Sequence, residues 1–215
     1  MAIGGADHAA EKRAMRREAR ARIAAVSAES RALASAAIVE KLLASAFYRE
    51  ARSLHCYISL PLEVDTAPVL LDAWQSGKAV YIPFQIPAQG RLGMARWEPG
   101  LTLVPGPLGV LEPPQESRQD ELPGSLDLVV VPGLAFDRRG TRLGRGKGYY
   151  DKFLASTPLT GGETAATPPV LAALAFSCQV FPALPCDTWD VPVKHIFTEN
   201  EAILAIIALT PAGDC

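Results

Sequence analysis

The sequence predicts a single α/β domain: a three-layer α/β/α sandwich, Rossmann-like, with a mostly parallel sheet. Helical patterns alternate along the chain with short apolar runs, and this alternation is typical of a sheet covered by helices on both faces. The run 126–131 is apolar almost throughout, as a central strand buried on both faces requires. The 215 residues contain no internal repeat and no inter-domain linker, so we expect 1–215 to form one domain.

The composition excludes several classes of protein. Hydrophobic residues make up 49% and charged residues 20% of the chain, which is globular composition. A net charge of −2 gives no global field that would attract nucleic acid or an acidic membrane. No apolar run approaches the roughly 20 residues of a spanning helix, and the start is too polar and glycine-rich for a signal peptide. Without a CxxC pair, Cys56 and Cys178 are expected to be core thiols in a cytoplasmic protein.

The first half of the chain favours helices around two strands. After a flexible start at 1–9, a basic helix is expected to about Ser27, because Met15, Ala19, Ile23 and Val26 recur at spacings of four and three. The elements expected next are a helix capped by Ser27 and running to about Phe47, a buried strand at 54–60, a helix from Asp65 or Thr66 to Trp74 that Gly77 stops, and a strand at 79–83.

The second half begins with a segment rich in proline and glycine. Residues 85–123 are expected to hold short strands near 92–97 and a long irregular connection. The elements expected after it are the central strand at 126–131, a loop, a short helix at 148–156, a flexible loop at 157–169, and strands at 170–176 and 193–197.

The loop that follows the central strand carries the clearest chemical signal. Ligands in open α/β sheets bind beyond the carboxyl ends of the strands. Glycine occupies alternate positions from Gly144 to Gly148, so successive backbone N–H groups can converge on an anion. Arg142, Arg145 and Lys147 add positive charge, and the following helix would aim its N-terminus at the same anion. We therefore predict a phosphate-binding loop.

Motif rules alone do not identify this loop. It is not a Walker A loop, because Gly148 follows Lys147 where Ser or Thr would be needed, and its third glycine comes one residue too early for GxGxxG. On composition alone, a mobile and solvated basic loop remains the alternative.

The segment Arg142–Asp151, shortly after Asp127–Asp137, resembles the signature of the 5-formyltetrahydrofolate cyclo-ligase family. Further stretches are similar to that family and follow in the expected order: Lys12–Arg16, Ser59–Thr66 and Asp187–Val193. The resemblance spans about residues 10 to 200 and is loosest between 85 and 124.

This resemblance implies an activity. The expected reaction is the ATP- and Mg²⁺-dependent cyclisation of 5-formyltetrahydrofolate to 5,10-methenyltetrahydrofolate, with release of ADP and phosphate, through a phosphorylated formyl intermediate. Phosphoryl transfer depends mainly on positioning and charge neutralisation, which Arg, Lys, backbone N–H groups and Mg²⁺ provide. The resemblance further implies a role in one-carbon folate metabolism. The protein is expected to be a cytoplasmic monomer with no nucleic acid or membrane partner.

The resemblance also assigns residues. The ATP contacts it implies are Lys12, Arg16, Arg142, Leu143, Gly144, Arg145, Gly146, Lys147, Gly148, Tyr149 and Tyr150. The folate contacts are Ile58, Glu63, Arg145, Gly146, Lys147, Gly148 and Tyr149. Arg145 and Lys147 are the expected catalytic residues, and Asp151 and Asp190 are the expected Mg²⁺ ligands, since Mg²⁺ prefers carboxylate oxygens.

Several of these assignments have a plainer alternative. Lys12 and Arg16 could lie on a solvated helix face, and Glu63 could be an acidic residue in the first turn of a helix. Asp151 could be an ordinary surface carboxylate. Lys194 stands where the family often has an acidic residue, so the charge near the metal would differ. The histidines, His8, His55 and His195, are expected to be structural.

Two other classes of function were considered. The basic helix and the Arg/Lys/Tyr loop could form a nucleic-acid-binding module, although the net charge of −2 opposes this. A non-catalytic sensor of nucleotides or sugar phosphates on the same scaffold would bind its ligand without turnover.

Overall fold

The computed structural model describes residues 4–119, 126–156 and 168–206. The helices in these residues are α1 Gly4–Ala25, α2 Ala28–Leu43, α3 Ala46–Glu50, α4 Ala67–Gln75 and α5 Tyr149–Ser156. The strands of the main sheet are β1 Ser53–Cys56, β2 Ala79–Ile86, β3 Arg91–Arg96, β6 Arg118–Gln119, β7 Leu128–Val131, β10 Val170–Leu174, β12 His195–Phe197 and β13 Ala202–Leu204. The remaining strands are β4 Val104–Pro105, β5 Leu111–Glu112, β8 Ala135–Asp137, β9 Arg142–Leu143 and β11 Val180–Phe181.

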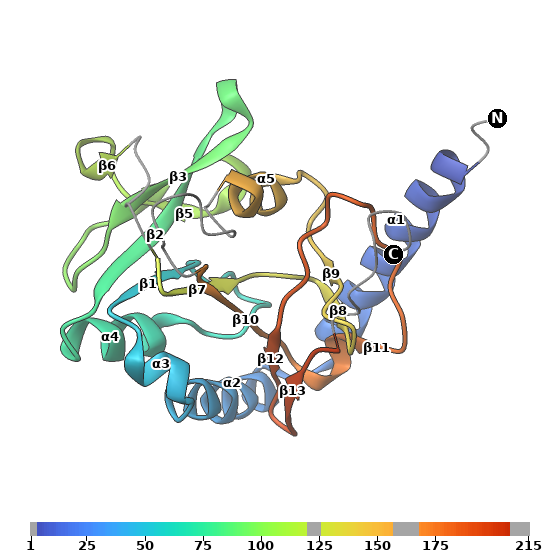
Figure 1. Cartoon of the computed structure of the whole chain (residues 1–215), viewed down its shortest axis with the longest axis horizontal. Helices are drawn as coiled ribbons and strands as arrows, with labels where there is room; N and C mark the ends of the chain where they lie inside the picture. The colour runs from blue at the N-terminus through green and yellow to red at the C-terminus, as the bar shows by residue number, and fades with distance from the viewer. Residues whose placement is uncertain (1–3, 120–125, 157–167, 207–215) are drawn as a thin grey trace.

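The main sheet of the described residues has eight strands in the order β13-β12-β10-β7-β1-β2-β3-β6. Neighbours from β12 through β10, β7 and β1 to β2 pair in parallel, whereas β13, β3 and β6 pair antiparallel at the two sides of the sheet (Figure 1). The predicted fold class, α/β with a mostly parallel sheet, is confirmed.

Both faces of the central strand β7 are buried, as its sequence predicts. Leu128 and Val130 belong to the apolar cluster that α2, α3 and α4 form on one face of the sheet. Val129 and Val131 belong to the cluster on the other face, where α5 contributes Phe153. Because successive side chains of a strand point to opposite faces, this uninterrupted apolar run serves both layers at once (Figure 1).

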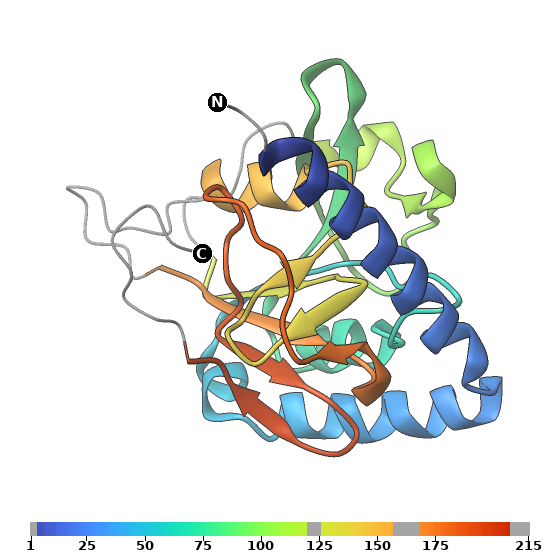
Figure 2. The same cartoon turned by 90° about the vertical axis from the view of Figure 1, so that its right-hand side faces the viewer.

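Helix α1 packs outside the three layers, against the small sheet β11-β8-β9 (Figure 2). Its Ala19 is fully buried in a cluster with Leu143 and Phe181 of that sheet. Residues 12, 16, 19 and 23 lie on one helix face at the four- and three-residue spacing. Burial of this face therefore turns Lys12 and Arg16 toward the body of the protein.

The boundaries differ from the expected ones in several places. Helix α1 already begins at Gly4, so residues 4–9 are helical and not the flexible start that was expected, while residues 1–3 lie outside the described residues. Strand β1 ends at Cys56. The carbonyl of the next residue, Tyr57, accepts a hydrogen bond from Thr66 Oγ1. The segment read as one loop contains the hairpin β8–β9. The expected loop at 157–169 lies mostly outside the described residues. Among the described helices, none is long and apolar enough to cross a membrane.

His55 of β1 lies in the part of the core that packs against α5, and its burial leads us to expect a fold that is sensitive to acid. Its side chain is fully buried, with ring centroids 4.9 Å from Phe153 and 5.8 Å from Tyr150. Neither ring nitrogen has a hydrogen-bond partner among the described residues. Burial lowers the pKa of His55 to about 3, so the folded protein holds this ring neutral while the unfolded chain takes up a proton below about pH 6.5.

We therefore expect the free energy of unfolding to fall as the pH drops from about 6.5 toward 3. Between pH 7.5 and 4.5 the contribution of His55 is about 2–3 kcal/mol, at about 1.4 kcal/mol per pH unit. Urea denaturation at both pH values checks this, with each protein serving as its own reference. His55→Phe should lose less stability than the wild type over this interval; parallel losses would assign the acid sensitivity to other groups.

Candidate active site

A cavity of about 320 Å³ opens beyond the carboxyl ends of β1 and β7, where the sequence predicts a ligand site. Its floor contains Ile58 after β1 and Pro132 and Gly133 after β7. The glycine-rich loop forms one wall, and α1 contributes Lys12 and Arg16. The cavity is therefore assembled from segments that are far apart in the sequence.

The glycine-rich loop adopts a conformation that only glycine tolerates easily. Gly146 and Gly148 have φ of +99° and +68°, in the left-handed region that disfavours a Cβ atom. A Cβ on Gly146 would also lie 3.4 Å from Arg16 Cζ. Arg16 Nε donates to the carbonyl of Gly144 at 2.9 Å, and α5 begins directly after the loop. The loop, the basic helix and the N-terminus of α5 thus meet at one place.

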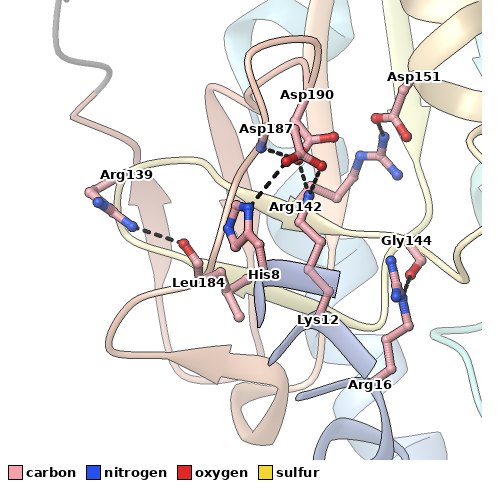
Figure 3. Close-up of polar contacts among 10 residues, drawn as sticks. All are labelled: His8, Lys12, Arg16, Arg139, Arg142, Gly144, Asp151, Leu184, Asp187 and Asp190. Carbon is pink, nitrogen blue, oxygen red and sulfur yellow. Dashed lines mark hydrogen bonds and ion pairs between the residues drawn. The ribbon is translucent and has the colours of Figure 1, made fainter. Parts of the chain in front are cut away.

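Lys12 lies between two carboxylates (Figure 3). Its Nζ is 2.8 Å from Asp187 Oδ2 and 2.7 Å from Asp190 Oδ2, and its side chain is 10% exposed. Burial alone would lower the pKa of Lys12, but the hydrogen bonds to Asp187 and Asp190 outweigh it and the pKa is raised. The same ammonium group lowers the pKa of Asp187. His8, one turn earlier on α1, contacts the other oxygen of Asp187 at 3.2 Å.

Arg142 and Asp151 form a second ion pair at the base of the loop (Figure 3). The Arg142 side chain is 3% exposed and also donates to the carbonyl of Pro132. Its Nε and the hydroxyl of Tyr150 are buried and have no hydrogen-bond partner among the described residues. Both residues border the cavity, and both groups can donate a hydrogen bond to a ligand with acceptor oxygens.

A third ion pair closes the mouth of the cavity. Arg145 donates to Glu63 Oε1 at 2.6 Å, and the backbone N–H of Leu60 donates to Glu63 Oε2 at 2.9 Å. Arg145 is about half exposed, and Lys147 is exposed. These two cations therefore lie at the entrance, whereas Lys12 and Arg142 lie deeper.

Every site residue predicted from the sequence borders this one cavity. They are Lys12, Arg16, Ile58, Glu63, Arg142, Leu143, Gly144, Arg145, Gly146, Lys147, Gly148, Tyr149, Tyr150, Asp151 and Asp190. The solvated-face alternative for Lys12 and Arg16 is wrong, because Lys12 is buried and Arg16 is half-buried and bonded to the loop. The first-turn alternative for Glu63 is also wrong, because α4 begins only at Ala67. Lys194 is exposed and does not border the cavity.

Other lining residues were missed by the sequence reasoning. Most form the wall opposite α1: Tyr57, Leu60, Pro83, Phe84, Gln85, Leu92, Val110 and Glu112. Two more, Asp187 and Trp189, come from the segment that also provides Asp190. Much of the missed wall lies in the stretch 85–123, which was interpreted as an irregular connection. The available signal was Glu112, a lone charge between Leu111 and Pro113.

The site combines hydrogen-bond donors that suit phosphate oxygens with two carboxylates. Within the described ranges, no group of three or more His, Cys, Asp or Glu side chains is arranged to hold a metal ion by itself. Asp151 and Asp190 border the same cavity from different segments. Two carboxylates completed by phosphate oxygens and water would suit Mg²⁺, which rarely uses an all-protein cage.

Fold and site together define an α/β protein with a cavity, lined by a glycine-rich loop and several cations, at the carboxyl edge of a mostly parallel sheet. Comparison with known proteins identifies the particular family. The chain matches the 5-formyltetrahydrofolate cyclo-ligase family over residues 8–199, and it belongs to that family of ligases.

Individual relatives agree with this assignment. The chain is 33% identical to the 5-formyltetrahydrofolate cyclo-ligase of Mus musculus, over 88% of this chain and 94% of the mouse protein. It is 35% identical to the Escherichia coli K12 protein of the same name, over 70% and 80% of the two chains. The solved structure of Aquifex aeolicus 5,10-methenyltetrahydrofolate synthetase superposes with a TM-score of 0.74 at 27% identity and covers 95% of this chain and 96% of that one.

Proposed function

We propose that this protein converts 5-formyltetrahydrofolate and ATP to 5,10-methenyltetrahydrofolate, ADP and phosphate, with Mg²⁺. Membership of the family supports the folate chemistry. The observation that best supports the use of ATP is the set of unpaired donors, Arg142 Nε and the Tyr150 hydroxyl, beside a loop rich in glycine and cations. Phosphate oxygens are the acceptors that such a set fits.

The reaction needs an activated formyl oxygen. The oxygen of the formyl group attacks the γ-phosphorus of ATP, and ADP leaves. N10 of the folate then attacks the activated carbon, N10 loses its proton, and phosphate departs to leave the methenyl bridge. In this scheme the loop from Gly144 to Gly148 and Arg142 hold the phosphates, while Arg145 and Lys147 neutralise the charge that develops on the transferred group.

Asp151 and Asp190 are the residues that would hold Mg²⁺. When bound, the ion neutralises phosphate charge and draws the nucleotide to these carboxylates. In the structure the same carboxylates pair with Arg142 and Lys12. On nucleotide binding, Arg142 and Lys12 would each turn from a carboxylate to a phosphate oxygen.

The direct test is incubation of the protein with 5-formyltetrahydrofolate, Mg²⁺ and ATP, followed by the absorbance of the methenyl product. We expect product only when both ATP and Mg²⁺ are present. Folded protein that forms no product, or forms it equally well without ATP, would refute the proposal. The protein is further proposed to act as a single-domain cytoplasmic monomer without nucleic acid or membrane partners; its net charge of −2 supports only the absence of those partners.

Arg16 provides a test of the ATP site. Replacing Arg16 by Ala should raise the KM for ATP more than that for the folate, and should lower kcat/KM for ATP roughly ten- to a hundredfold, because a charge-assisted hydrogen bond contributes about 1.5–3 kcal/mol. Steady-state kinetics with each substrate varied in turn measures this. Arg17→Ala, an exposed change on the same helix, is the control. Equal effects of the two changes on the KM for ATP would show that Arg16 does not contact ATP.

A further inference from the structure

We propose that Gln85 recognises the amino-pyrimidinone edge of the folate ring, and that Glu112 holds Gln85 in place for this contact. This inference rests on the proposed function and names a contact that the resemblance does not assign. It concerns the wall of the cavity formed by β2 and β5, which lie on the left of Figure 1, whereas α1 lies on the right.

Gln85 has a buried hydrogen-bond acceptor that the protein leaves unsatisfied. The residue is 8% exposed and borders the cavity. Its Nε2 donates to the carbonyl of Pro107 at 2.9 Å, which fixes the orientation of the amide. Its Oε1 is buried and has no hydrogen-bond partner among the described residues. An unsatisfied buried acceptor costs about 1–3 kcal/mol, so a ligand with an N–H donor would gain from contact with it.

Glu112 fixes the position of this amide. Its side chain is 1% exposed, and Oε1 accepts the backbone N–H of Gln85 at 3.0 Å. Oε2 is 3.2 Å from a terminal nitrogen of Arg118, whose guanidinium lies 5.0 Å from the centre of the Phe84 ring. The backbone of Gly106 packs so closely on this carboxylate that a Cβ there would clash at 2.4 Å. Glu112 is therefore committed to structural contacts and acts as a positioning residue.

The wall around Gln85 suits the pterin ring of the folate better than the phosphates of ATP. Phosphate oxygens are acceptors and cannot satisfy Gln85 Oε1, whereas the pyrimidinone edge of a pterin presents an amino group and a ring N–H. Leu60, Phe84 and Leu92 border the cavity beside Gln85 and offer the apolar surface that a planar ring needs. Glu63, the folate contact implied by the resemblance, already has both oxygens engaged. Gln85 thus carries an unpaired acceptor in a residue of the cavity wall, and a hydrogen bond from a neutral ring to it would break no ion pair.

Calorimetric titration with 5-formyltetrahydrofolate, without ATP, tests this contact independently of turnover. Gln85→Met keeps the length and removes the acceptor; we expect its Kd to rise about tenfold, the effect of one hydrogen bond of about 1.4 kcal/mol. The same rise is expected with 5-formyltetrahydropterin, and no change with p-aminobenzoylglutamate, which lacks the ring. Gln89→Met makes the same substitution at an exposed position and should bind like the wild type.

Kinetics separates the possible outcomes. The KM for the folate should rise in Gln85→Met while the KM for ATP stays constant; a rise for ATP alone would place adenine at Gln85 and overturn the inference. Wild-type affinity for the pterin in Gln85→Met would also overturn it. Wild-type protein that binds the pterin but makes no product would refute the proposed function and leave the inference standing.

A measurement on the unchanged protein covers the case in which Gln85→Met fails to fold. The wild type should bind an analogue with methyl in place of the 2-amino group about tenfold more weakly than the parent compound, since one hydrogen bond is lost. Equal binding of the two compounds by the wild type would overturn the inference.

Discussion

Arg142→Met is expected to lower kcat/KM by about a hundred- to a thousandfold, the usual effect of removing a preorganised charge donor from a transition state. The change removes an almost fully buried guanidinium and leaves Asp151 facing the phosphates without its partner. Loss of one member of a buried ion pair also destabilises the fold, here by about 2–3 kcal/mol because Asp151 is 22% exposed. Steady-state kinetics and urea denaturation measure the two effects separately.

A second variant separates the loss of activity from general unfolding. In the double change Arg142→Met with Asp151→Asn, both charges are gone, so most of the lost stability should return. Activity should stay low, because the phosphates have lost Arg142 as a donor. Recovery of activity together with stability would mean that Arg142 only maintains the fold.

Asp190→Asn is expected to raise the Mg²⁺ concentration needed for half-maximal activity and to lower kcat by about a hundredfold, as for the loss of another charged group in a phosphoryl-transfer site. Its carboxylate borders the same cavity as Asp151, and two carboxylates beside a triphosphate repel it unless a cation lies between them. If the two act on one ion, the double change Asp190→Asn with Asp151→Asn should cost less than the sum of the single changes. Titration of activity with Mg²⁺ checks this.

Asp187→Asn is the matched control for that experiment. Asp187 shares Lys12 with Asp190, but it is not among the residues proposed to hold the ion. Its replacement should leave the Mg²⁺ requirement close to that of the wild type. An equal shift for Asp187→Asn and Asp190→Asn would show that the effect passes through Lys12 and not through the metal.

The sheet could be predicted from the sequence because its strands carry their own pattern. The apolar run 126–131 predicts burial on both faces, and β7 lies in the middle of the sheet as expected. The hairpin β8–β9 was missed because its residues, including Arg142, read as a charged loop. Their strand conformation depends on packing against α1 and β11, which no local pattern encodes.

The candidate site could be predicted only in part, for a related reason. The glycine-rich loop is continuous in sequence and carries its chemistry in Arg142, Arg145 and Lys147, so it could be found. The opposite wall combines single residues, such as Gln85 and Glu112, whose proximity depends on the hairpin β4–β5 lying against β2. The burial of Lys12 was missed because its partners, Asp187 and Asp190, lie near the other end of the chain.

That last contact has a consequence for the chain as it leaves the ribosome. Lys12 is 178 positions from Asp190, and Arg16 is 128 positions from Gly144. Helix α1 precedes all of these partners in the sequence, and its apolar face packs against Leu134, Ala135 and Leu143 as well as against the later Phe181 and Leu184. Contacts of such long sequence separation form late, so a nascent chain that stops short of residue 187 lacks both carboxylate partners of Lys12. The last contacts of α1 in the site therefore form only when most of the chain has been made.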